Sequence, residues 1–291
     1  MSKLRILAVF AALFWPVFLC PLLHSDEDLY QLPQLSKEVP VPAKERLVLA
    51  DVFVRGDATR SPVVTPAAEQ ALIASLPADF RDACRRMMKP WGEQSIGTER
   101  WNARLLQWNR DADRVFLIVA FRCSSSNSNN DGYYDERPAV LTLEQSAARL
   151  RLIPLAEPCD NCADLYHVEF SQQFSVSGGT LIELASSSSN DSPAVGVVDS
   201  CAVGRLHYVL LPEGAPVLAI ISRNNSVSHD DVEGDATFHC EAKLDYRRDS
   251  SGRLTEIVPD RACPAGITDK APQAFRYRWN PSRRTFDSRP L

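Results

Sequence analysis

Apolar residues follow the two-residue period of β-strands over most of the chain after residue 101. Residues 115–121 (VFLIVAF) and 217–221 (VLAII) are unbroken apolar runs of strand length, typical of central strands that are covered on both faces. Apolar and charged residues alternate along residues 240–246 and 275–279, the pattern of strands with one solvent-facing side. These segments predict a core built from sheets.

Clusters of turn-forming residues separate the predicted strands at short intervals. They occur at residues 109–111, 212–214, 249–252 and 280–282. Short loops of this kind join antiparallel neighbours as hairpins. We therefore predict a mainly β fold of antiparallel hairpin-linked sheets, arranged as a two-sheet sandwich or a propeller-like array, with a short N-terminal helical element.

The helical element is predicted at residues 65–89. Thr65 is a good N-cap, Pro66 suits the first helical position, and residues 67–76 are helix formers. The apolar residues that follow have the spacing of one helical face and predict a second helix, with Cys84 on its inner side.

Two parts of the chain echo each other. Residues 116–123 (FLIVAFRC) and 148–159 (ARLRLIPLAEPC) resemble residues 217–224 (VLAIISRN) and 252–263 (GRLTEIVPDRAC) in composition and order. An internal duplication would favour a sandwich or propeller over a single barrel. Chance similarity between hairpins is the other interpretation.

Residues 1–25 have the layout of a signal peptide. Lys3 and Arg5 precede an apolar run at residues 6–23, which ends at a polar stretch. A retained membrane anchor is the alternative, and Pro16 and the modest length of the run count against it. We expect an exported protein, periplasmic or secreted, with no transmembrane segment in the mature chain.

The remaining residues divide into a linker and one domain. Residues 26–46 are rich in proline and charge, which suits an extended tether. Residues 47–291 are long enough for a sizeable core and are predicted to be a single mainly β domain, with its β region at residues 101–291. The formal net charge of −5 argues against a nucleic-acid partner, which would require a concentrated basic face.

The chain contains eight cysteines, which fits export. Seven would remain after signal removal, and in an oxidising compartment most should pair. Cys240 and Cys263 flank a hairpin turn and should lie close together, so they are the preferred disulfide. Cys123 with Cys159 is the analogous pair in the first half of the echo.

Cys159 and Cys162 also have the spacing of redox and metal sites. A redox pair needs a helix N-terminus, whereas a strand-like segment follows here. A zinc knuckle beginning with these cysteines and His167 would find Gln172 in place of its fourth ligand. A structural disulfide and a redox or metal role both remain open.

One loop is a candidate calcium site. Residues 127–135 (NSNNDGYYD) resemble the DxNxDGxxD calcium loop of dockerin-type and integrin-propeller repeats. The resemblance implies Asn127, Asn129, Asp131 and Asp135 as ligands, although asparagine replaces the usual first aspartate. A solvated loop with an Asp-Gly turn is the alternative. No other cofactor is expected.

Three Ser/Asn-rich segments, at residues 124–130, 186–192 and 222–230, follow apolar strands. If these strands run in the same direction, the segments gather at one end of the sheet as a polar surface suited to binding a partner. Flexible hairpin ends have the same composition, so both interpretations stay open.

Sequence motifs of catalysis are missing, including GxSxG, phosphate-binding glycine loops and HExxH. We therefore hypothesise an exported, non-catalytic binding protein that recognises a protein or cell-envelope component through its Ser/Asn-rich loops. An inhibitor or immunity-type role is suggested by analogy alone. The alternative is a secreted hydrolase-type enzyme with a dispersed, calcium-supported site. His229 beside Asp230 and Asp231 is a candidate acid/base or metal cluster, or simply part of a charged loop.

Overall fold

A computed structural model describes residues 38–55, 63–81, 99–111, 114–125, 134–144, 146–155, 165–190, 200–211, 213–230, 234–264 and 272–291. Residues 32–291 form one compact unit. The fold is mainly β, with antiparallel sheets and short helices before them, as the sequence predicts.

The predicted helix start at Thr65 is confirmed. Helix α3 covers Pro66–Ala74, and Thr65 caps it because its Oγ1 accepts a hydrogen bond from the Ala68 amide at 3.2 Å. Residues 78–81 are helical as well. Cys84, in the predicted second helix, lies outside the described residues.

The folded part begins earlier than predicted. Strand β1 (Val39–Pro40) pairs with β5 (Ala148–Leu152), and helix α2 covers Ala43–Phe53. The linker prediction for residues 26–46 is therefore corrected from residue 38 onward. Its prolines mark element boundaries, because Pro42 stands at the N-cap position of α2 and Pro40 lies in a strand that pairs on one side with β5.

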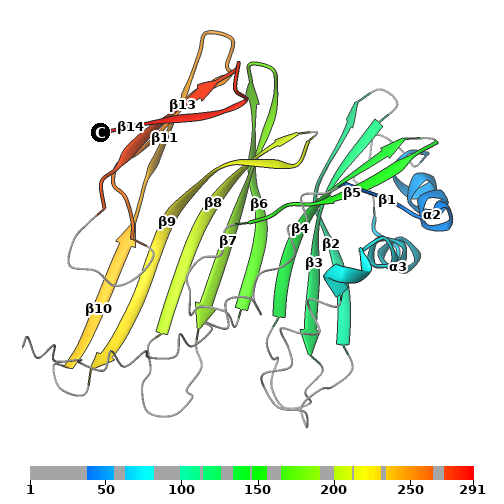
Figure 1. The fold of residues 1–291 in the computed structure, drawn as a ribbon, viewed down its shortest axis with the longest axis horizontal. Helices are drawn as coiled ribbons and strands as arrows, with labels where there is room; N and C mark the ends of the chain where they lie inside the picture. The colour runs from blue at the N-terminus through cyan, green and yellow to red at the C-terminus, as the bar shows by residue number, and fades with distance from the viewer. Residues whose placement is uncertain are drawn as a thin grey trace, which may run out of the picture. The chain divides into compact units, whose positions relative to one another are not determined.

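In the described part of the chain, ten strands form one large sheet (Figure 1). Besides β1 and β5 these are β2 (Glu99–Asp111), β3 (Arg114–Ser125), β4 (Tyr134–Glu144), β6 (Leu165–Val176), β7 (Gly179–Asn190), β8 (Ser200–Leu211), β9 (Ala215–Asp230) and β10 (Gly234–Glu241). Consecutive strands from β2 to β5 and from β6 to β10 pair antiparallel, which confirms the predicted hairpins.

The large sheet forks at β4. One edge of β4 pairs with β3 from end to end. The other edge pairs in parallel with β6 at only two positions, Tyr134 with Leu165 and Asp135 with Tyr166, and farther along pairs with β5 at residues 139–143. Strand β6 thus leaves β4 after two residue pairs, and β5 takes its place.

A second, four-stranded sheet follows in the chain. Its strands are β11 (Leu244–Arg248), β12 (Leu254–Pro259), β13 (Phe275–Asn280) and β14 (Thr285–Pro290), paired antiparallel in chain order. The two halves of the sequence echo have different surroundings, because β5 belongs to the large sheet whereas its counterpart β12 belongs to this small one.

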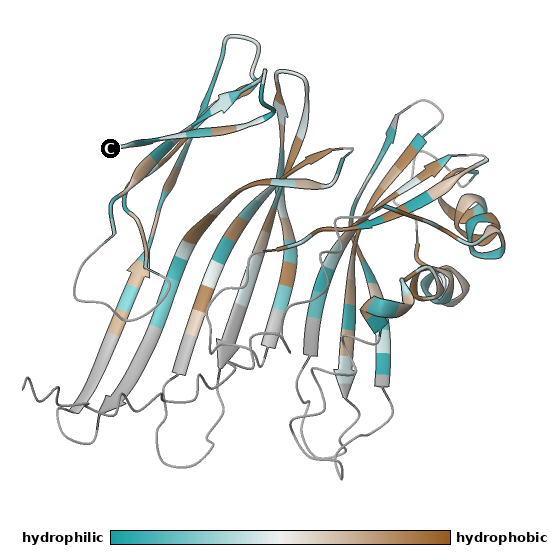
Figure 2. Ribbon diagram, in the orientation of Figure 1, coloured by the Kyte–Doolittle hydropathy of each residue, from teal (hydrophilic) through white to brown (hydrophobic). Residues whose placement is uncertain are grey.

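Three hydrophobic clusters hold the layers together. The first packs α2 and α3 on one face of β3, β4 and β5, the second joins the opposite face of β3 and β4 to β6, β7 and β8, and the third packs the small sheet on β6 to β9. In Figure 2 these strands show alternating hydrophobic and hydrophilic bands. Buried members of the three clusters include, in turn, Leu72 and Leu141, Ile118 and Ile182, and Leu181 and Ile257.

A β-bulge in β6 decides which residues face which cluster. The register with β7 shifts between Phe170 and Gln172. Val168, before the bulge, belongs to the second cluster, and Phe174, after the bulge, belongs to the third. In a regular strand these two residues, six positions apart, would face the same side. The extra residue therefore lets one strand contribute to both cores.

Candidate functional site

Side chains replace the backbone ladder where β6 leaves β4. The Val168 amide donates a hydrogen bond to Glu136 Oε2 at 3.0 Å, and the Val168 carbonyl accepts one from Arg104 Nη2 at 2.7 Å. Both backbone groups of Val168 are thus bonded although the β4–β6 ladder has ended. The fork in the sheet is closed by two charged side chains.

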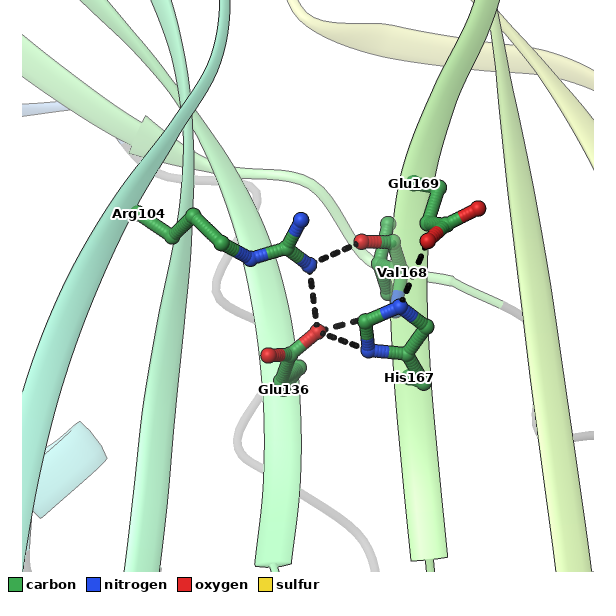
Figure 3. Close-up of polar contacts among 5 residues, drawn as sticks. All are labelled: Arg104, Glu136, His167, Val168 and Glu169. Atoms are coloured by element: carbon green, nitrogen blue, oxygen red, sulfur yellow. Dashed lines mark hydrogen bonds and ion pairs between the residues drawn. The ribbon is translucent and has the colours of Figure 1, made fainter.

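Glu136 is the centre of a group that we call the fork cluster, namely Arg104, Glu136, His167 and Glu169 (Figure 3). The Glu136 side chain is 4% exposed, and its Oε2 lies 2.9 Å from Arg104 Nη2 and 2.8 Å from His167 Nδ1. His167 Nε2 lies 3.0 Å from Glu169 Oε1. Both ring nitrogens therefore face carboxylate oxygens.

Charge in the fork cluster is closely matched. A buried carboxylate such as Glu136 requires hydrogen-bonding or charged partners, and Arg104 and His167 provide them. The hydrogen bond and charge of His167 lower the pKa of Glu169 below its ordinary value, and the charge of Arg104 acts in the same direction. Two cationic side chains therefore stand beside two anionic ones when His167 is protonated.

Strand register explains why these residues meet. Arg104 comes from β2, Glu136 from β4, and both His167 and Glu169 from β6. Arg122 on β3 pairs directly with Glu136, so it lies on the same face of the sheet. The parallel β4–β6 pairing brings His167 next to Glu136, because His167 is the next position after Tyr166 as Glu136 is after Asp135.

The cluster continues as a row of residues across the sheet. His167, Ser187, Gly204, Arg223 and Glu241 are successive ladder partners on β6 to β10, so they share one face. Arg223 and Glu241 are exposed. We call this row together with the fork cluster the fork face. It is a mixed-charge surface that combines a buried anchor with exposed hydrogen-bonding groups.

The exposed parts of the fork cluster can bind or exchange protons. The side chains of Arg104, His167 and Glu169 are 44%, 34% and 64% exposed. Within the described residues, His167 makes no hydrogen bond to a hydroxyl or thiol. The geometry thus supplies donors, acceptors and an oriented imidazole, without a paired nucleophile in that part of the chain.

The candidate calcium loop falls mostly outside the described residues. Asn127, Asn129 and Asp131 are not described, and of Asp135 only the backbone position is, in β4 opposite Cys123. Within the residues that are described, no group of three or more His, Cys, Asp and Glu side chains is arranged to hold a metal ion.

The preferred disulfide is present. Cys240 and Cys263 are bonded, with their Cα atoms 5.6 Å apart, and connect β10 to the segment after β12. Cys123 also forms a disulfide. The predicted partner Cys159 and its neighbour Cys162 lie outside the described residues.

The Ser/Asn-rich segments are largely strands where loops were expected. Residues 186–190 belong to β7 and residues 222–230 to β9, and residues 186–189 and 223–227 pair with neighbouring strands on both sides. Strands β3, β7 and β9 run in the same direction, which fulfils the condition for gathering these segments at one end of the sheet. His229 and Asp230 lie in β9, and Asp231 is not described.

Two other buried polar groups have structural partners. His207 Nε2 lies 2.8 Å from Ser186 Oγ in the interior. Glu183 accepts hydrogen bonds from Ser171 Oγ at 2.7 Å, from Gln172 Nε2 at 3.1 Å and from the Tyr246 hydroxyl, which ties β11 to β7. These contacts hold the layers together beneath the surface.

Sequence reasoning identified His167 as a candidate ligand but anticipated neither Arg104 nor the contact between His167 and Glu136. The available signal was the position of Glu136 in β4, where it shares the inward period of Pro138 and Val140. A charged residue at such a position indicates a buried partner.

Among the residues described here, no helix has the length and apolar character needed to cross a membrane. Comparison of the chain with protein-family models, curated proteins and solved structures found no match.

Proposed function

We propose that this chain is an exported, non-catalytic binding protein and that a protein partner docks on its fork face. The observation that carries the proposal is the fork cluster itself. Glu136 is buried and fixes Arg104 and His167, while parts of both side chains and most of Glu169 stay exposed. Charged groups held in place in this way lose little conformational freedom when a partner binds.

The form of the fork face favours a large partner over a small molecule. Its row of residues crosses five strands, from β6 to β10. A cavity of about 210 Å³ lies away from this row, lined by residues such as Phe116, Thr142 and Arg151. Small ligands bind in pockets, whereas proteins bind on broad surfaces with mixed polar groups.

Export is supported by the cysteine chemistry. Structural disulfides persist in oxidising compartments, and the chain contains one between Cys240 and Cys263 and another at Cys123. The apolar residues 6–23 after Lys3 and Arg5 are consistent with a signal peptide.

A hydrolase-type enzyme is the second candidate, and one observation favours it. His167 is oriented by the buried carboxylate of Glu136, an arrangement that also positions general acids and bases. The enzyme hypothesis requires turnover that is lost in His167→Ala, whereas the binding hypothesis requires a partner and no turnover.

Charge reversal on the fork face tests the proposal. Glu169→Lys should reduce the amount of partner that co-purifies by at least about tenfold, because reversing a charge in an interface places like charges of the two proteins opposite each other. Asp51→Lys on α2 is the matched control, because Asp51 is equally exposed and distant in sequence from the fork face. Equal capture by both variants, or catalytic turnover that depends on His167, would refute the binding proposal.

A further inference from the structure

Charge is divided unevenly along the chain. Residues 243–291 contain eleven Lys and Arg against six Asp and Glu, a formal net charge of +5, whereas the whole chain has 32 against 37 and a net charge of −5. The small sheet, which lies in this segment, is therefore basic within an acidic protein.

The outer face of the small sheet contains arginines that oppose one another. Tyr246, Ile257 and Tyr277 face the third cluster, so the alternate positions of these strands point away from it. Among the alternate positions, Arg276 on β13 pairs directly with Arg289 on β14. Like charges directly opposite each other destabilise a strand pair, so this pair is unfavourable in the absence of an anion.

The acidic residues of this face have several partners each. Glu256 lies 2.9 Å from Arg247 and 3.9 Å from Arg276, so its closer contact is with Arg247. Asp287 accepts hydrogen bonds from Asn280 and Arg283.

Two of the arginines form no side-chain hydrogen bond or ion pair in the described part of the chain. They are Arg278, which stands opposite Glu256 and Asp287 on the neighbouring strands, and Arg289, which stands opposite Arg276, and both are exposed. The guanidinium groups of Arg278 and Arg289 thus lie on one face with that of Arg276, which has a single ion-pair contact of 3.9 Å with Glu256.

We propose that this arginine face docks on an anionic phospholipid surface. A guanidinium group donates paired hydrogen bonds to phosphate oxygens, and a phosphate between Arg276 and Arg289 removes their repulsion. The Leu291 amide donates a hydrogen bond to the Ala274 carbonyl and so extends the β13–β14 ladder by one step. Leu291 therefore lies on the same side of the sheet as Arg289, and it is 50% exposed. An apolar residue beside cationic ones fits the boundary between headgroups and acyl chains.

Vesicle binding of the full chain tests the proposal. Vesicles of phosphatidylcholine with phosphatidylglycerol should bind the protein, with affinity rising with the phosphatidylglycerol fraction and falling with salt. Phosphatidylcholine vesicles alone measure any contribution from apolar segments. In the triple variant Arg276→Gln/Arg278→Gln/Arg289→Gln, the phosphatidylglycerol-dependent affinity should fall by roughly a hundredfold, which corresponds to about fivefold for each charge removed.

The control variant removes the same number of charges from elsewhere. Arg55, Arg253 and Arg261 are paired with Asp51, Asp249 and Asp260, and neutralising all three should change vesicle affinity less than about threefold. An equal loss in both variants would show that net charge alone acts and would overturn the proposal. Stronger binding to poly-glutamate than to vesicles, or salt-sensitive self-association in place of vesicle binding, would overturn it as well. Competition by millimolar inorganic phosphate at constant ionic strength would indicate a free-phosphate site instead.

Discussion

Glu136 and Glu183 are buried carboxylates that the fold satisfies in different ways. Glu136 accepts hydrogen bonds from Arg104 and the Val168 amide at the fork and lies 2.8 Å from His167 Nδ1, whereas Glu183 accepts its hydrogen bonds from uncharged side chains between the sheets. Burial of an unpaired carboxylate costs several kcal/mol, so loss of either set of partners should lower the free energy of unfolding.

Glu136→Gln should lower the free energy of unfolding by about 2 kcal/mol, because it removes the charge that Arg104 is hydrogen-bonded to and that lies beside His167. Glu169→Gln should change it by less than about 0.5 kcal/mol, since that side chain is 64% exposed. Urea denaturation of both variants measures the difference. Equal, small effects would mean that the fork does not depend on the buried charge.

His207 should make the protein less stable in acid. Burial, helped by the charge of Arg205, lowers its pKa from 6.5 to about 4, so the unfolded chain binds the proton more readily than the folded chain. The free energy of unfolding is therefore unaffected by this group above pH 6.5. As the pH falls from 6.5 toward 4, it decreases by on the order of 2 kcal/mol. His207→Gln should flatten the stability curve over this range, and urea titrations at pH 7.5 and 4.5 measure it. An unchanged slope would refute the assignment.

Contacts between elements depend on a few polar groups in an apolar interface. Tyr246 on β11 donates to Glu183, and the Tyr208 hydroxyl lies 3.2 Å from that of Tyr246. Burial raises the pKa of Tyr246 and Tyr208. Both hydroxyls therefore stay protonated and able to donate.

Tyr246→Phe should destabilise the protein by about 2 kcal/mol, because it leaves Glu183 short of one donor and Tyr208 without its hydroxyl partner. Tyr277→Phe is the control, since Tyr277 packs in the same cluster and its hydroxyl makes no hydrogen bond with the described residues. Thermal unfolding of the two variants gives the comparison. A loss in Tyr277→Phe as large as in Tyr246→Phe would show that packing of the rings, and not the hydroxyl, matters.

The disulfide links β10 of the large sheet to the segment that follows β12 of the small sheet. Cys240 and Cys263 are separated by 23 positions in the sequence. Replacing both by serine should lower the free energy of unfolding by on the order of 3 kcal/mol, because the unfolded chain gains conformational freedom. Urea denaturation measures the loss, and non-reducing mass analysis checks the pairing. A double variant as stable as the parent would mean that packing around the site already holds the small sheet in place.

Local patterns predicted the elements better than their arrangement. Alternation and turn residues predicted the antiparallel hairpins, and Thr65 marked a helix start. Helix α2 was missed because prolines before residue 43 suggested a tether. The Ser/Asn-rich segments gave no strand signal, since their pairing in β7 and β9 comes from neighbouring strands and not from their own propensity.

The molecule as a whole has two charged surfaces that sequence alone could not assemble. The fork face depends on Arg104, Glu136 and His167, which come from three strands and meet only because β6 leaves β4 after two residue pairs. The arginine face depends on the register that sets Arg276 opposite Arg289. Neither the fork nor the register has a local sequence signature, whereas the basic character of residues 243–291 could be counted directly.

Site-specific photocrosslinking in the native cell tests the central claim, that the fork face is a docking surface. A photoreactive residue at position 169 should give a discrete crosslinked species that weakens when Arg104 is changed to Glu. The same residue at position 51 on α2, which has similar exposure, should give none. Crosslinks of equal yield from both positions, or none from position 169 in a correctly folded and exported protein, would contradict the account.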